Sequence, residues 1–132
     1  SYFGHEPEAC ANCHVMQGQY DGWIKSSHRA VAACNDCHAP HDLLPKFAIK
    51  GLNGFRHSLA FTLGGFHEPI AITSLNRSVT ENACRHCHED VATAMLALDA
   101  GHGGARGEVS CIRCHGSVGH PSGSAVASFE ER

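Results

Sequence analysis

The chain of 132 residues has the length of one domain, with 10 lysines and arginines against 13 acids and a formal net charge of −3. Without a block rich in Lys and Arg, this balance excludes nucleic acid as a partner, because phosphates would have to be neutralised. No run of 18 or more apolar residues is present, so the sequence as given contains no transmembrane helix. Eight cysteines and 12 histidines are the abnormal part of the composition, and they direct attention to bound cofactors.

The eight cysteines fall without remainder into four C-x-x-C-H motifs, a pattern typical of covalent c-type haem. The pairs are Cys10/Cys13, Cys34/Cys37, Cys84/Cys87 and Cys111/Cys114. Two thiols one helical turn apart can form thioethers to a haem, and the next histidine can ligate the iron. Zinc also accepts these ligands, but four identical copies lack finger spacing. A disulfide scaffold needs no histidine after each pair, and a thioredoxin-like site needs a preceding strand. The sequence predicts four c-type haems.

The first motif differs from the others because Met16 follows its histidine by two residues. Met16 is a second possible iron ligand, and it lies too close to His14 for the two side chains to bind opposite faces of one iron. If Met16 takes the axial position, His14 is displaced and the other face is weakly ligated or open. The alternative is that Met16 only packs against the porphyrin.

In chain order, the segment after the first motif, residues 17–27, is a weak helix because it contains two glycines. Residues 89–99 predict a better helix, with acids in the first turn and Gly101 as a stop. Gly-rich turns are expected from Gly101 to Gly107, and strand signals are nearly absent. We therefore expect a mostly α protein with much irregular structure, a small multihaem cytochrome c organised around four covalently attached haems that supply much of its core.

A single domain, residues 1–132, is expected, with two di-haem halves at about 1–45 and 80–125. Between them lies an insert rich in Phe and Leu, about 43–66, whose cations are Lys46, Lys50 and Arg56. Such a stretch suits a bilayer interface, or equally a buried helix against haem faces; the two interpretations are compatible. On a helix, Lys50 and His57 share a face. Lys50 is a cation that can hold an oxygen anion, and His57 has an imidazole that can move protons. Beside an open haem, this pair suits a ligand that gives up two electrons and two protons. The alternative is an interfacial lysine and a histidine packed on haem.

Low-spin haem iron takes two strong axial ligands, so free histidines should join the motif histidines His38, His88 and His115. His28 and His102 are the first candidates, since each follows a motif histidine by 14 residues. His120 and then His41 come next, five residues after His115 and three after His38. His5, His67 and His86 are predicted not to be ligands.

Five stretches of this chain resemble the NapC/NirT family of membrane-anchored tetrahaem quinol dehydrogenases, over nearly its whole length. They are Cys10 to Met16, Trp23 with Ser27-His28, Cys34 to Pro40, His57 to Gly64, and the end of the last two motifs at Gly119-His120. The resemblance implies that Met16 ligates the first haem and that menaquinol is oxidised beside it. It places the quinol site at Lys50 and His57, where the family pattern has an acid in the second position. It also implies that His28 and His120 are distal ligands, whereas a partner's side chain can replace His102.

The resemblance further implies an anchor, a location and a partner. An N-terminal transmembrane helix, not present in this sequence, would hold the domain at the periplasmic or extracytoplasmic face of the membrane, where c-type haem is attached. The menaquinol pool would supply electrons, and the partner would be the catalytic subunit of a multihaem cytochrome c nitrite reductase, which reduces nitrite to ammonium. The alternatives are service to another reductase such as nitrate reductase, a soluble periplasmic tetrahaem shuttle, and a reductase of small substrates at an open haem.

Overall fold

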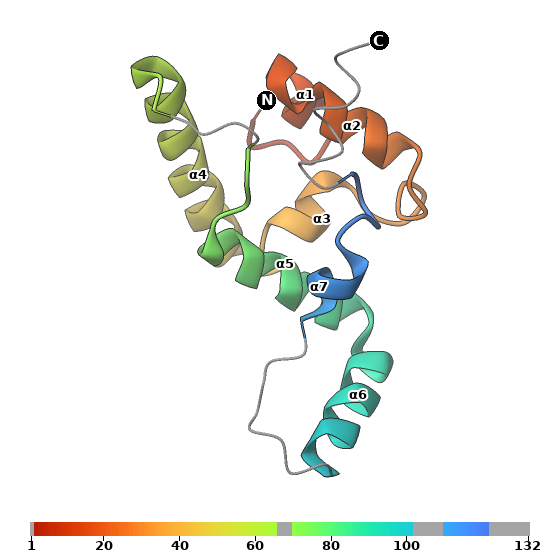
Figure 1. Cartoon of the computed structure of the whole chain (residues 1–132). Coiled ribbons are helices and arrows are strands. Elements are labelled where there is room, and N and C mark those ends of the chain that lie inside the picture. The colour runs from red at the N-terminus through yellow and green to blue at the C-terminus, as the bar shows by residue number, and fades with distance from the viewer. Residues whose placement is uncertain (1, 66–69, 102–109, 122–132) are drawn as a thin grey trace.

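The computed structural model describes residues 2–65, 70–101 and 110–121, and these form helices joined by irregular segments (Figure 1). No strand occurs in these three ranges. The elements in chain order are α1 (Glu8–Ala11), the 3-10 helix η1 (His14–Met16), α2 (Gln17–Ile24), α3 (Cys34–His38), α4 (Leu43–Leu63), α5 (Ser74–Cys87), α6 (Glu89–Gly101) and α7 (Cys111–His115). The predicted mostly α class is confirmed.

The cysteine motifs coincide with short helical turns. The second and fourth motifs are the whole of α3 and α7, and the third ends α5. Side-chain caps start these turns: Asp36 accepts the backbone N–H of Ala33 at 2.8 Å, and the Ser110 hydroxyl accepts that of Arg113 at 3.3 Å. Capping of this kind satisfies amide groups that a short helix leaves without partners. The cysteine pairs of α3 and α7 are therefore held one turn apart by local interactions.

The expected helices differ in how well their sequence explains them. α6 begins at the acids Glu89 and Asp90 and ends at Gly101, as predicted. α2 forms despite its two glycines, one of which has a packing reason given below. The predicted turns after Gly101, together with His102 and His67, lie outside the described residues.

The insert folds as α4, which confirms the expected helix through Lys50 and His57. It continues to Leu63 and stops at Gly64, whose φ of 69° is in the left-handed region that glycine adopts without a Cβ penalty. In Figure 1, α4 extends away from the other helices. Many of its apolar side chains are exposed, Leu44 at 85 % and Phe55 at 66 % among them. Within the described ranges, neither α4 nor any other helix has the length and hydropathy to span a membrane.

The described residues bury almost no apolar core of their own. Ala39 and Ala83 are the buried hydrophobic residues, and no large side chain is fully buried. α3 packs against α5, while α5 also contacts α6 and α7. Helices this short and open cannot bury enough surface to be stable alone. The fold is that of a chain whose interior is completed by bound groups.

Candidate haem and quinol sites

The helix packing gathers the four cysteine motifs. α3 and α7, which carry the second and fourth motifs, both lie against α5, which carries the third. The first motif adjoins the second through a hydrogen bond between the thiols of Cys10 and Cys34. This hydrogen bond is the largest cause of the lowered pKa of Cys10, which is about 6. The motifs therefore form one connected group, as transfer between haems requires.

The two cysteines of a motif differ in how far the polypeptide covers them. Cys13, Cys87 and Cys114, each the second cysteine of its motif, are exposed, whereas the other five cysteines are partly buried. The difference is clearest in α7, where Cys111 faces Glu81 of α5 while Cys114, one turn further on, is exposed. The eight cysteines form no disulfide, and the thioether roles of all eight stay predictions.

The ring of His28 faces that of the motif histidine His88, with ring centres 6.2 Å apart and planes at 76°. Two imidazoles that share one metal place their centres about 6 Å apart, since each metal–nitrogen bond is about 2 Å long. The Ser27 hydroxyl lies 3.3 Å from Nδ1 of His28. If that nitrogen is the one engaged by Ser27, Nε2 is left for iron, as in other metal-bound histidines.

A second pair has the same spacing. The ring centres of His38 and His120 lie 5.9 Å apart with their planes at 14°, and Nδ1 of His120 is 3.2 Å from the carbonyl oxygen of Pro121. His38 is exposed as a whole residue, yet desolvation of its ring and the neighbouring His120 lower its pKa to about 4. The ring is neutral at pH 7, which is the form that binds metal.

Gly22 on α2 allows the chain at His120 to approach. A Cβ at this position would lie 2.3 Å from Cδ of Pro121 and 3.1 Å from Cβ of His120. No side chain fits at the first distance, so only glycine permits this contact. From the sequence, Gly22 was expected only to weaken the helix. A glycine within a predicted helix can indicate that another segment packs closely there, and Gly22 offered that signal in the sequence.

The remaining candidate ligands are less completely placed. His41 lies against His86, with ring centres 4.3 Å apart, which is closer than two rings bound to one iron would be. Met16 ends η1, and its backbone N–H donates to the carbonyl of Cys13 at 2.8 Å. Within residues 2–65, 70–101 and 110–121, no close ring contact joins His115 to another histidine. The ligand roles of all these residues stay predictions, those of the two histidine pairs included.

Lys50 is buried on α4, with 6 % of the residue exposed. Its Nζ donates to the carbonyl oxygen of Gly4 at 2.9 Å and lies 6.0 Å from the centre of the Tyr2 ring. The same carbonyl accepts Nδ2 of Asn35, from the second motif, at 2.9 Å. Desolvation lowers the pKa of Lys50, and the nearby Cys10 thiol opposes that shift. The hydrogen bond to Gly4 therefore holds the ammonium next to the first motif, a contact that the sequence did not predict.

His57 is two helical turns beyond Lys50 on α4 and is exposed. Gly54 lies between them on this face, and the Tyr2 ring covers it: a Cβ at Gly54 would lie 3.0 Å from Cε1 of Tyr2. The two predicted quinol-site residues thus share a face, as expected. They differ in environment, since the lysine is covered and the imidazole faces solvent.

The donor set fits c-type haem. Cysteine pairs sit one helical turn apart, two histidine pairs have the spacing of a shared metal, and the described interior lacks the apolar groups that would otherwise fill it. Among the described residues, no cluster of three or more potential metal-ligating side chains occurs. The fold and site define a small helical multihaem cytochrome c.

Residues 3–125 match the NapC/NirT cytochrome c family, N-terminal region. The chain belongs to this family. It is 37 % identical over 127 residues to the cytochrome c-type protein NrfH of Wolinella succinogenes, covering 91 % of this chain and 71 % of that one. It is 32 % identical over 121 residues to the cytochrome c nitrite reductase subunit NrfH of Nitratidesulfovibrio vulgaris, covering 92 % and 71 %.

The fold also has a solved counterpart. In the crystal structure of a cytochrome c nitrite reductase NrfHA complex bound to the inhibitor HQNO, one chain superposes with a TM-score of 0.72 at 29 % identity. The match covers 86 % of this chain and 73 % of that one.

Proposed function

We infer that this chain is the quinol-oxidising electron-transfer subunit of a cytochrome c nitrite reductase. The observation that carries this function is the buried Lys50 ammonium, held beside the first cysteine motif on the helix face that also presents His57. The family resemblance and the NrfH relatives support the same assignment. The quinol we propose is menaquinol.

Lys50 and His57 have different roles in the proposed oxidation of a quinol. Oxidation of a quinol to a quinone releases two electrons and two protons. A Lys50 ammonium can donate a hydrogen bond to the quinol oxygen and stabilise the anion that forms as the proton leaves. The exposed imidazole of His57 can accept that proton and pass it to water, since histidine is the side chain that most often acts as a general base. An imidazole here replaces the acid of the family pattern.

The proposed cofactor set is four c-type haems, one on each cysteine pair, which supply the one-electron steps. His28 with His88 and His38 with His120 are the histidine pairs that would hold two of the irons, as their ring spacings support. Met16 is the residue that would ligate iron at the first site. His115 would take its second ligand from His102 or from the partner.

The exposed apolar side chains of α4 give this quinol site access to lipid. Leu44, Phe47, Phe55 and Leu59 are all at least 47 % exposed, on a helix that carries Lys46 and Arg56 and no acid. Side chains of this kind partition into the bilayer interface while the cations contact headgroups. We place the domain at the periplasmic face of the membrane, where a lipid-soluble quinol reaches Lys50 and His57.

Electrons would leave to the catalytic subunit of cytochrome c nitrite reductase. A similar chain occurs in the solved NrfHA complex, which is a cytochrome c nitrite reductase. Two experiments test the function. Anaerobic mixing of the haem-loaded protein with a menaquinol analogue should reduce its haems in a phase that HQNO inhibits. Addition of the catalytic subunit should then couple quinol oxidation to nitrite consumption.

The outcomes separate the alternatives. Haem reduction by dithionite but not by the quinol analogue would contradict the quinol site and favour a soluble electron shuttle. Quinol oxidation that couples to a nitrate reductase and not to nitrite would assign a different partner. Nitrite turnover by the chain alone would make it a reductase.

A further inference from the structure

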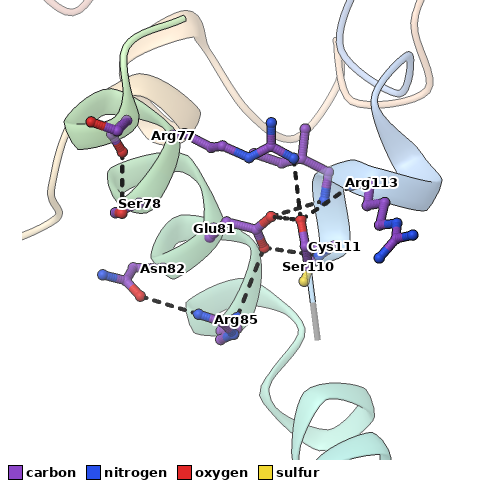
Figure 2. Close-up of polar contacts among 10 residues, drawn as sticks. Arg77, Ser78, Glu81, Asn82, Arg85, Ser110, Cys111 and Arg113 are labelled. Carbon is purple, nitrogen blue, oxygen red and sulfur yellow. Dashed lines mark hydrogen bonds and ion pairs between the residues drawn. The ribbon is translucent and has the colours of Figure 1, made fainter. Parts of the chain in front are cut away.

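Glu81 is a buried carboxylate that none of the proposed quinol or ligand roles uses. It is 7 % exposed and lies on α5, three residues before Cys84 of the third motif. Arg77 and Arg85, one turn before and one turn after it, share its face of the helix. Figure 2 shows Glu81 and Arg77 directed at the start of α7, where the fourth motif begins, while Arg85 is directed at Glu81 and Asn82.

The carboxylate of Glu81 holds the first residues of α7. It accepts the backbone N–H of Cys111 at 2.8 Å, that of Ile112 at 3.2 Å and a hydrogen bond from the Ser110 hydroxyl. Nη2 of Arg77 donates to the same Ser110 hydroxyl at 3.5 Å. A side chain of the third motif's helix thus caps the helix of the fourth, although about 30 residues separate them. Three hydrogen bonds to one ionised group are a strong link.

Glu81 also brings charge to both attachment sites. Desolvation would raise the pKa of Glu81, but the hydrogen bonds from Ser110, Cys111 and Ile112 outweigh it, and the pKa lies below its ordinary value. The group is therefore ionised at pH 7. After desolvation, the Glu81 carboxylate is among the causes that raise the pKa of Cys111 and of Cys84. Nη2 of Arg85 lies 3.9 Å from the carboxylate.

We propose that Glu81 is a positioning residue that fixes the third and fourth haem-attachment sites against each other and lowers the reduction potential at both through its buried negative charge. This rests on haem attachment to the motifs, as part of the proposed function, and requires neither a quinol nor a partner. A negative charge stabilises the oxidised, more positive iron, and net charge near a haem is one determinant of its potential. Burial makes that effect larger than an exposed carboxylate would give.

A merely structural link and an electrostatic one predict different results for two variants. Glu81→Gln removes the buried charge and Arg85→Met removes the partly buried opposite charge, while both remove a contact of the Glu81 carboxylate. If only the contact mattered, both variants would shift the potentials in the same direction. If charge acts, the first raises them and the second lowers them. Asp90→Asn, an exposed acid two residues beyond His88, is the control for a charge screened by water.

The measurement is a redox titration of the haem-loaded protein followed by EPR, which resolves low-spin haems by their g values. We expect Glu81→Gln to shift the redox equilibrium of two haems about tenfold toward the reduced form, or about 59 mV for one electron. Arg85→Met should shift the same two haems toward the oxidised form, and Asp90→Asn should change them by less than half as much. Shifts of equal sign in the first two variants, or none, would overturn the proposal.

Two features keep this test separate from the quinol function. The titration uses mediators and dithionite, so a failed quinol assay leaves its result unaffected. If Glu81→Gln does not mature with its full haem content, Arg85→Met still tests the sign of the charge effect, and an unchanged or raised potential in that variant rejects it.

Discussion

The ring of His120 lies nearly parallel to that of His38, with their centres 5.9 Å apart, although one belongs to the last described segment and the other to the second cysteine motif. The other pair, His28 with His88, also crosses between the two ends of the chain. The two sequence halves are therefore interleaved through their proposed ligand pairs. Each iron would tie together segments that are distant in the chain.

Replacement of His120 by Ala removes one strong axial ligand and leaves the thioethers in place. We expect one haem to change from low spin to high spin, seen by absorbance and EPR, with haem content unchanged. His86→Ala is the control, since that histidine is predicted not to bind iron. An unaltered spin state in His120→Ala would contradict the pair with His38.

Gly22→Ala should disturb the same haem without touching a ligand. The new methyl group would lie 2.3 Å from Cδ of Pro121, so the segment with His120 must move away. Overpacking of this kind typically costs about 1–3 kcal/mol, measured by thermal or denaturant unfolding of the holoprotein. We also expect a fraction of high-spin haem. Gly51→Ala, where no atom lies within 4 Å, should leave both measurements unchanged or slightly increase stability.

Met16→Leu tests the ligand at the first motif. The apolar isostere keeps the volume and removes the thioether sulfur, so the spectrum and potential of one haem should change while the others do not. The second methionine of the chain, Met95, is exposed on α6 and provides the matched control as Met95→Leu. A first haem with unaltered spectrum and potential would remove Met16 from the ligand set.

Lys50→Met tests the quinol site while retaining most of the side-chain stem. Loss of the ammonium should lower kcat/KM for a menaquinol analogue about tenfold or more, or about 1.4 kcal/mol of transition-state stabilisation. Reduction by dithionite and haem content should stay normal. Lys46→Met, on the same helix and only partly exposed, is the control. Equal activity in Lys50→Met and wild type would reject the assignment.

His57 is tested by two substitutions with opposite expectations. His57→Phe removes the proton acceptor and should slow quinol oxidation with haem potentials unchanged. His57→Asp restores the acid of the family pattern and should retain activity, because a carboxylate can also accept the proton. Steady-state rates of quinol oxidation provide the measurement. Equal rates for His57→Phe and wild type would exclude His57 as the proton acceptor.

The sequence by itself determined the features that depend on near neighbours. A haem needs two thiols one helical turn apart and a histidine next to the second, and all of these lie within five residues of each motif, from Cys34 to His38 for example. The helix through Lys50 and His57 also followed from local periodicity, since residues that share a face recur every three or four positions. The family was recognisable from the same motifs.

Only the tertiary structure decided which distant groups meet. A repeat spacing of 14 residues predicted that His28 is a ligand. It did not predict that His88 would face His28, because that pairing depends on how α5 packs. Gly22, Gly4 and Glu81 carried no chemical motif. They act through a close contact, a backbone carbonyl and a cap between two helices. Contacts of this kind form between segments far apart in the chain, so no local pattern encodes them.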